Sequence, residues 1–148
     1  MQTYSDNKYI YSVDMMFAYL YLRKPQYQNI KVSDLLKNLN HNCWGDPVNN
    51  IYHTPNDVLA NPTKYEHDYK RIKNADLSYP IIITHDMHII DGVHRLTKSY
   101  MENKKTIKAY VFDNALLRKF KLAKRNEWDK VDKLKNYQLI IMFSKKFD

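Results

Sequence analysis

The spacing of hydrophobic residues alternates along the chain between the two-residue period of strands and the longer period of helices. Two runs rich in β-branched residues, Pro80–Thr84 and His88–Ile90, are separated by three residues and predict a short hairpin. In Thr106–Phe112 apolar residues alternate with other residues, which predicts another strand. Shorter extended runs are predicted at Asn29–Val32 and, near the end of the chain, at Gln138–Phe143.

Helices are predicted from start and stop signals. Ser12 is a suitable cap for a helix that ends before Pro25. Thr54 precedes a proline at the first position of a short helix, and Thr63 and Glu66 form a capping box for the next one. The predicted helices cover about 12–23, 34–39 after a cap at Ser33, a short stretch from 54, 63–74, 92–103, 114–126 and a further C-terminal segment; Asn40–His53 is predicted as a loop.

This order of elements predicts an α/β (mixed α+β) fold in which helices pack on a small mixed sheet. A chain of 148 residues has the size of one ordinary domain. No repeat, low-complexity segment or linker interrupts it. We therefore expect a single domain over residues 1–148, with a core at about 30–112 and a helical C-terminal extension at 114–148.

Charge and cysteine content narrow the class of protein. The chain has 24 Lys and Arg against 16 Asp and Glu, a net charge of +8 that attracts polyanions. Asn, Lys, Ile and Tyr all have AT-rich codons, so part of this basicity suits a low-GC microbe or virus. A lone Cys43 excludes an internal disulfide and predicts a reducing, cytoplasmic location. Without a signal-peptide pattern or a membrane-length apolar run, no membrane partner is expected.

Residues 91–95 carry the clearest chemical signal. Gly92 is one of only two glycines, which predicts a positive φ or a close approach at this position. A strand that ends here and opens a helix directs the N–H groups of Val93 and its neighbours at one point. Arg95 can bind phosphate oxygens in a bidentate manner, and His94 can donate a hydrogen bond or transfer a proton. The motif therefore predicts a phosphate site.

Further residues extend this hypothesis. Asp91 can bind Mg²⁺ or accept a proton from a substrate hydroxyl. Thr97 and Lys98, in the first turn of the helix, can contact the same phosphate. The alternative is structural: the segment is only a turn, in which Asp91 caps the helix and Arg95 forms a salt bridge on its surface.

The succession of strand, short turn, Ile-Ile-Asp-Gly strand, Val-His-Arg-Leu helix start and following strand resembles the ParB/sulfiredoxin superfamily over about residues 30–112. The resemblance implies that superfamily's fold and a turn that binds nucleotide phosphates. With its leading aspartate the turn resembles that of the free-serine kinases of this fold. It implies ATP, ADP or CTP as ligand, Mg²⁺ as cofactor, and kinase or nucleotidase chemistry with Asp91 and His94 as catalytic residues.

The chain also departs from these families. Val93 occupies the position of the reactive cysteine of sulfiredoxins, so their reductase chemistry is not expected. Partitioning ParB proteins have a different turn and a helix-turn-helix domain, which this sequence lacks. Serine kinases take an acidic base from the segment after the first strand, yet no glutamate precedes Glu66. A base from that segment is then Asp34, Asp46 or His41.

Several features have two interpretations. Trp44, with His41 and Asp46, is a candidate wall of the pocket, where its ring either stacks on a base or pins the loop to the core. His85 and His88 predict an exposed turn rather than a metal site. The basic residues at 118–125 predict a solvated helix face; as an alternative function, they supply a non-specific surface for a nucleic-acid-binding or nuclease-like module. The thirteen tyrosines are expected in the core and its rim rather than on a base-stacking platform.

Overall fold

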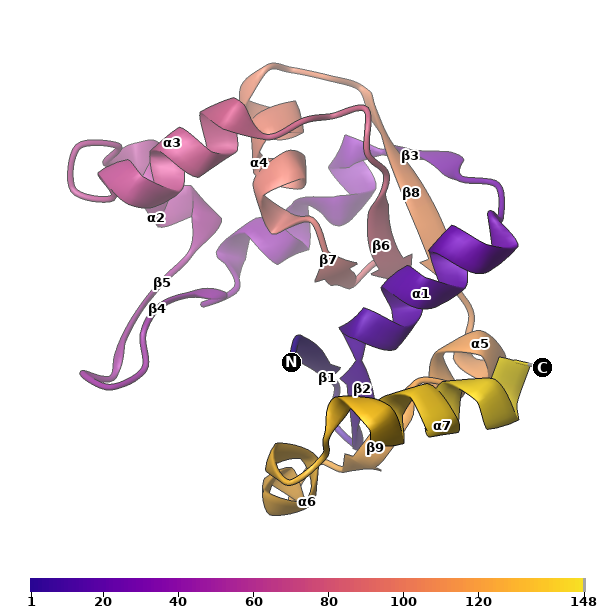
Figure 1. Ribbon diagram of the computed structural model, residues 1–148. Helices are drawn as coiled ribbons and strands as arrows, with labels where there is room; N and C mark the ends of the chain where they lie inside the picture. The colour runs from indigo at the N-terminus through magenta and orange to yellow at the C-terminus, as the bar shows by residue number, and fades with distance from the viewer. Residues whose placement is uncertain (148) are drawn as a thin grey trace. The chain divides into compact units, whose positions relative to one another are not determined.

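The computed structural model describes residues 1–147 and confirms a mixed α/β fold (Figure 1). The chain divides into two compact units, described separately: unit 1 comprises Met1–Gln26 and Phe112–Asp148, and unit 2 comprises Tyr27–Val111. Unit 1 joins the N-terminal segment to the residues that follow Val111, and the single domain expected from the sequence stays a prediction. Among the described residues, no helix has both the length and the hydropathy needed to cross a membrane.

Unit 2 is built on a four-stranded sheet with the order β3-β8-β6-β7. Strand β3 (Gln28–Lys31) runs antiparallel to β8 (Thr106–Phe112). Strand β6 (Ile81–Thr84) runs antiparallel to β7 (Ile89–Asp91), which confirms the predicted hairpin. All four residues of β6 are buried, as expected of a β-branched strand covered on both faces.

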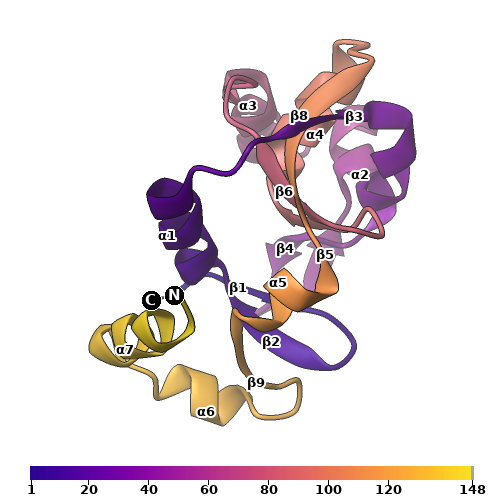
Figure 2. The ribbon, with the colours of Figure 1, turned by 90° about the vertical axis from the view of Figure 1, so that its right-hand side faces the viewer.

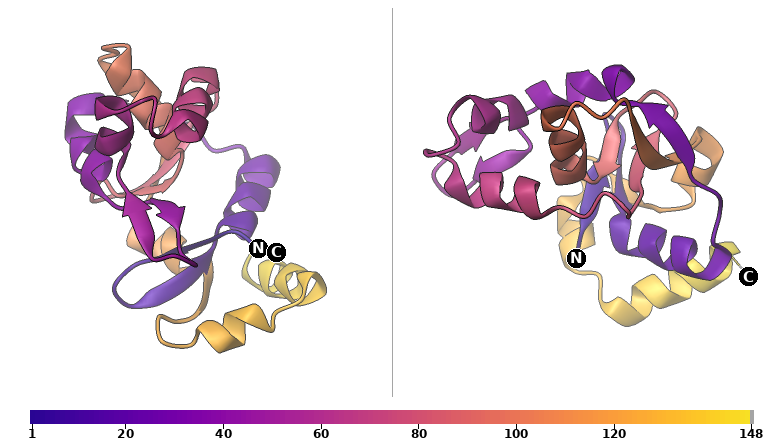
Figure 3. Two further views of the ribbon diagram at one scale, coloured as in Figure 1. Left: turned by 90° about the vertical axis from the view of Figure 1, so that its left-hand side faces the viewer. Right: turned by 90° about the horizontal axis from the view of Figure 1, so that it is seen from above.

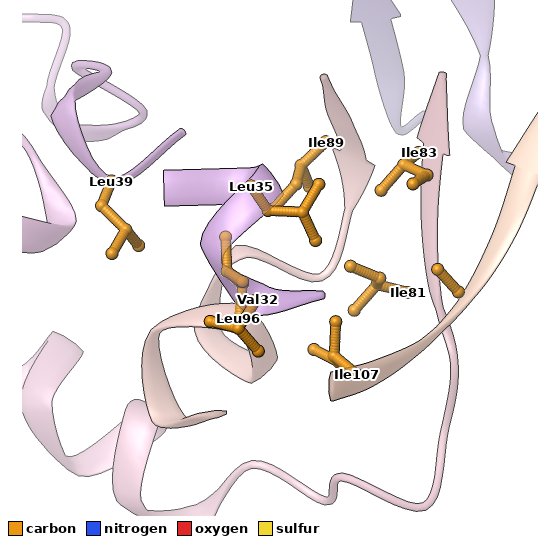
Figure 4. Close-up of a cluster of buried hydrophobic side chains, with 9 residues drawn as sticks. Val32, Leu35, Leu39, Ile81, Ile83, Ile89, Leu96 and Ile107 are labelled. Atoms are coloured by element: carbon orange, nitrogen blue, oxygen red, sulfur yellow. The ribbon is translucent and has the colours of Figure 1, made fainter. Parts of the chain in front are cut away.

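The helices of unit 2 enclose one hydrophobic core (Figure 4). In Figure 1, helix α4 (Val93–Met101) lies between the sheet and α3 (Glu66–Asn74). A 3-10 helix, η1 (Val32–Asn40), contacts α4 from another side. Full burial of one such aliphatic side chain contributes about 1.5–3 kcal/mol. The buried members of this core are Val32, Leu35, Leu39, Ile81, Ile83, Ile89, Leu96, Ile107 and Ala109.

Helix α2 (Pro55–Ala60) confirms the predicted start with proline, and Thr54 forms a capping box with Asp57. The capping box predicted at Thr63 is wrong, because α3 begins at Glu66 without a side-chain cap. Instead, the Asn61 side chain accepts a hydrogen bond from the backbone N–H of Lys64 at 3.2 Å. A local turn therefore replaces the predicted cap.

The predicted cap at Ser33 is also wrong. Helix η1 begins at Val32, two residues before the predicted start at Asp34, and its flanking residue Lys31 makes no side-chain cap. The backbone N–H of Val32 donates to the carbonyl of Lys105 at 3.0 Å. The segment before β8 therefore provides the acceptor for the N–H group at the helix start. In many helices a capping side chain provides this acceptor.

The stretch predicted as a loop contains a hairpin that the sequence analysis missed. Strands β4 (Trp44–Asp46) and β5 (Ile51–His53) pair antiparallel, with Trp44 opposite His53. This hairpin projects as a two-stranded ribbon (Figure 3, left). Strands of three residues show too few positions for an alternating pattern, so sequence periodicity does not reveal them.

Unit 1 is organised around a three-stranded antiparallel sheet, β1-β2-β9 (Figure 2). Ser12 accepts a hydrogen bond from the N–H of Met15, which confirms the predicted cap of α1. Stacked and edge-on rings from α1, β8 and α7 pack together in this unit. Its elements are β1 (Thr3–Ser5), β2 (Tyr9–Ser12), α1 (Val13–Arg23), α5 (Asn114–Arg118), β9 (Lys121–Lys124), α6 (Trp128–Asp132) and α7 (Asn136–Phe147).

Two predictions in this unit are wrong. The helix predicted at 114–126 ends at Arg118, because residues 121–124 pair with β2 and place Ala123 opposite Ile10. The strand predicted at 138–143 is part of helix α7. Strand β9 pairs with a strand that lies over a hundred residues earlier in the chain. Such pairing leaves no local signal, and the apolar residues at helical spacing therefore predicted a helix there.

Candidate functional site

The start of α4 has the backbone conformation that the sequence predicted. Gly92 has φ +114° and precedes the first residue of the helix without a side-chain cap. A Cβ atom here would lie 2.3 Å from the Cγ2 atom of Ile81. Glycine is therefore required because the helix start packs directly against β6. The first backbone N–H groups of α4 have no partner within the helix, which makes them donors for an anion.

Arg95 links three backbone segments, and we call this set the Arg95 clamp. Its Nη2 atom lies 2.8 Å from Oδ2 of Asp91. Its Nη1 atom donates to the carbonyls of Tyr79 at 3.0 Å and Pro80 at 2.8 Å. The Arg95 and Asp91 side chains are only 19% and 20% exposed. Of the two alternatives, the structure contains the salt bridge, and phosphate binding by Arg95 would require this clamp to open.

The residue that precedes α4 is Gly92, which provides no side-chain cap. The two residues expected to extend the phosphate grip have partners inside the protein. Thr97 is buried and its hydroxyl donates to the carbonyl of Val93 at 2.7 Å. The Lys98 ammonium donates to the carbonyl of Ala75 at 2.8 Å, next to the C-terminal end of α3. The Thr97 contact therefore lies within α4, whereas Lys98 links α4 to the end of α3.

His94, at the second position of α4, lies in a different set of contacts. Its ring stacks on Trp44 with centroids 4.4 Å apart and an interplanar angle of 19°. Its Nε2 atom lies 3.5 Å from Oδ1 of Asp68, on α3. This nitrogen is buried and makes no hydrogen bond. Its separation from Asp68 corresponds to an ion-pair distance without hydrogen-bond geometry.

Asp68 also contacts a second imidazole. Its Oδ2 atom lies 2.7 Å from Nε2 of His53, on strand β5. The His53 ring stacks on Tyr65 with centroids 4.4 Å apart. We call His53, Asp68 and His94 the His-Asp-His cluster. Its three side chains are 11%, 16% and 20% exposed, and the rings of Trp44 and Tyr65 flank it on two sides.

The surroundings of His94 favour the neutral imidazole. Burial lowers the pKa of His94 below its ordinary value, and the charges of Arg71 and His67 lower it further. The Asp68 carboxylate opposes this change. Burial prevails because the ring lies between Trp44 and the helix. A perturbed histidine beside a partly buried carboxylate is a candidate for proton transfer.

The lowered pKa of His94 predicts a pH dependence of stability. In the unfolded chain this histidine takes up a proton near pH 6.5, but in the folded protein it does so only at lower pH. Its contribution is therefore complete above pH 6.5 and is lost as the pH falls below that value. We expect the melting temperature to fall between pH 7 and pH 5 in the wild type, and to fall less in His94→Gln. Equal slopes in differential scanning fluorimetry would contradict this expectation.

The other predicted pocket residues lie elsewhere. The His41 ring stacks beside His88 with centroids 6.2 Å apart, next to the β6–β7 turn. Asp46 accepts hydrogen bonds from Val48 and Asn49 and thereby shapes the β4–β5 turn. Of the three candidate wall residues, only Trp44 contacts the start of α4.

Cys43 is exposed as a residue, while its thiol is partly shielded. This shielding raises the pKa of Cys43 to about 11, and the negative charge of Asp68 adds to the increase. The thiol is therefore protonated at neutral pH, when thiolate is the nucleophilic form. That Cys43 carries no reductase chemistry stays a prediction.

The sequence analysis did not assign roles to His53, Asp68 or Tyr65. These residues come from two elements and approach the start of α4 only through folding. Trp44 and His53 are close in sequence and pair in the β4–β5 hairpin. This proximity was predictable only if the two very short strands had been recognised. Asp68 has no neighbouring signal, because an acidic residue in a first helical turn is common for helix stability alone.

Within residues 1–147, no group of three or more His, Cys, Asp or Glu side chains has a geometry that could hold a metal ion. His85 and His88 are each 3.9 Å from Asp86 at the β6–β7 turn.

Comparisons of the chain with protein-family models, curated proteins and solved structures give no match. The resemblance to ParB/sulfiredoxin proteins stays a prediction.

Proposed function

We propose that the chain binds a nucleotide or a similar phosphorylated ligand at the start of α4, and that His94 transfers a proton during kinase- or nucleotidase-type phosphoryl chemistry. One observation carries the proposal. His94 stands in the first turn of α4, beside the helix donors, and its buried Nε2 faces Asp68 without a hydrogen bond. Buried polar atoms without partners are rare and call for an explanation in function.

The cluster supports a definite protonation scheme. A neutral imidazole has one N–H and one lone pair. The nitrogen that faces a carboxylate favours the proton, so Nε2 of His94 carries it and Nδ1 is left as the base. Asp68 then orients His94, as a carboxylate orients the histidine in hydrolytic triads. The separation of 3.5 Å shortens on ligand binding in this scheme, since catalytic hydrogen bonds are often long in free enzymes.

In this scheme the nucleotide provides both the phosphate oxygens that the helix binds and the Mg²⁺ ion. The N–H groups of Val93 and His94 face phosphate oxygens at the positive end of the helix dipole. Mg²⁺ is commonly held by substrate phosphates with one or two carboxylates, so it arrives with the nucleotide. Nδ1 of His94 takes the proton of an acceptor hydroxyl or water, whose oxygen attacks the terminal phosphorus as the bond to the leaving phosphate breaks. Asp91 and Arg95 hold the turn that presents these groups.

The proposal is tested by thermal shift with ATP, ADP, CTP and GTP, with and without Mg²⁺, followed by assays of phosphate release and transfer. We expect at least one nucleotide to raise the melting temperature of the wild type. His94→Gln should retain this shift and lower turnover about 100-fold or more, as loss of a general base does. Asp68→Asn should lower turnover in the same direction by removing the orienting charge.

His85→Gln is the matched control, because His85 is exposed at the β6–β7 turn and lies outside the His-Asp-His cluster. It should leave both the shift and the turnover unchanged. Circular dichroism confirms that each variant is folded. If no nucleotide raised the melting temperature of the wild type, the proposed nucleotide site would be wrong. If folded His94→Gln turned over substrate at the wild-type rate, His94 would not be the proton-transfer residue.

A further inference from the structure

One face of the sheet in unit 1 brings tyrosines and basic residues together. In the antiparallel register Tyr4 lies opposite Tyr11, and Tyr9 lies opposite Lys124. Side chains two residues apart on a strand share a face, and so do directly paired residues. Tyr11 also pairs with Lys121. The aromatic and basic side chains of β1, β2 and β9 therefore share one face.

The opposite face of the same sheet is apolar. Ile10 is fully buried, and it packs with Ala123 and Val131 in the hydrophobic core of unit 1. This division fixes the orientation of the sheet, because a shift of one residue would exchange its two faces. The face that bears the tyrosines, which we call the tyrosine face, is thus a consequence of core packing.

The rings on the tyrosine face are held in a defined arrangement. Tyr4 stacks on Tyr11 at 6.0 Å between centroids, and Tyr9 meets Tyr11 edge-on at 6.3 Å. The hydroxyl of Tyr11 donates to Oδ2 of Asp6 at 2.6 Å, which anchors the buried central ring. Tyr9 is only half-buried, and the Lys121 ammonium lies 4.7 Å from its ring centroid. The cation therefore covers one face of the Tyr9 ring in a cation–π contact, and a base would stack on the other face.

Positive charge is concentrated in this unit. Unit 1 holds 13 Lys and Arg against 7 Asp and Glu, a net charge of +6, whereas unit 2 holds 11 against 9, a net charge of +2. Lys121, Lys124 and Arg125 are exposed around the tyrosine face. Arg125 is positioned by a 2.9 Å hydrogen bond to the carbonyl of Asp6.

We propose that the tyrosine face binds single-stranded nucleic acid, with Lys121, Lys124 and Arg125 contacting phosphates and Tyr9 stacking on a base. Proteins that bind single strands without sequence preference combine these two kinds of side chain. A duplex keeps its base faces stacked internally, so the ring of Tyr9 has a partner only in a single strand. The proposal is independent of the nucleotide site, which lies in unit 2.

The experiment measures anisotropy of labelled oligo(dT) and oligo(U) of about 12 nucleotides, the length scale of one small binding fold, against a duplex of equal length. We expect the full-length protein to bind the single strands tighter than the duplex. Lys121→Ala/Lys124→Ala should weaken binding about ten-fold and reduce the salt slope by roughly 1.4, the value for two phosphate contacts to a single strand. Tyr9→Leu should weaken it about five-fold or more with an unchanged slope, and Tyr9→Phe should bind as the wild type.

Lys104→Ala/Lys105→Ala is the matched control, because it removes two exposed positive charges from unit 2. It should change affinity by less than two-fold. Trp128 fluorescence reports whether unit 1 is folded in each variant. Equal losses for both lysine pairs, or full binding by folded Tyr9→Leu, would overturn the proposal.

Discussion

Replacing Gly92 by alanine is expected to lower the free energy of unfolding of unit 2 by about 2–5 kcal/mol. Two costs add up. An L-residue in the left-handed region costs about 1–2 kcal/mol, and the φ of Gly92 is +114°. Inserting a methyl group into a packed interface typically costs a further 1–3 kcal/mol, and the new Cβ would meet Ile81 at 2.3 Å. This loss is a large fraction of the stability of a small domain.

The measurement uses the two tryptophans of the chain. Trp44 lies in unit 2 and Trp128 in unit 1, so urea unfolding of a Trp128→Phe background reports on unit 2 through Trp44. Ile81→Ala in the same background removes the nearer of the two clashing atoms, Cγ2, and leaves Cβ at 2.8 Å. The double variant with Gly92→Ala should cost less than the sum of the single variants, because neighbouring residues couple. Strict additivity would show that Ile81 and residue 92 are not in contact.

The second large effect concerns the Arg95 clamp. Arg95→Ala removes two hydrogen bonds to carbonyls and one ion pair, and it leaves the partly buried Asp91 without its cation. Hydrogen bonds to charged groups contribute about 1.5–3 kcal/mol, and loss of one partner of a buried pair costs about 3–5 kcal/mol. Because both side chains keep some exposure, we expect a loss of about 2–4 kcal/mol. The stability of Arg95→Lys should lie between those of the wild type and Arg95→Ala, since lysine keeps the charge but lacks the planar guanidinium group.

Nucleotide affinity separates this structural role from direct phosphate binding. If Arg95 only clamps the turn, folded Arg95→Ala should bind nucleotide within about two-fold of the wild type. If Arg95 contacts phosphate, affinity should fall about ten-fold or more, while stability changes little. Lys104→Ala, an exposed charge in the same unit, serves as the control for unfolding. An unchanged unfolding midpoint in Arg95→Ala would show that the clamp does not stabilise unit 2.

Parts of the fold that depend on neighbours in sequence were predictable. The β6–β7 hairpin, the Ser12 cap and the proline start of α2 are each set by a few consecutive residues. Their signals are steric or involve one nearby hydrogen bond, so they act in any tertiary context. The positive φ of Gly92 belongs to the same class, because glycine adopts this conformation without the steric cost that a Cβ atom brings.

Elements that depend on distant partners were not predictable in the same way. Strand β9 forms because residues 121–124 pair with β2, and in α7, which replaces a predicted strand, Leu139 and Phe147 are the buried residues. Tertiary packing overrides local propensity in such segments, since propensities differ by less than about 1 kcal/mol per residue. The tyrosine face likewise requires β2 and β9 to pair.

The sequence by itself determined the turn at residues 91–95, its glycine and the histidine that opens α4. Only the tertiary structure decided what surrounds that turn. Folding brings Asp68 and Trp44 to His94, and it brings the carbonyls of Tyr79 and Pro80 to Arg95. Local geometry follows from backbone sterics within a few residues, whereas a buried charge selects its partner from whatever the packed core brings within reach.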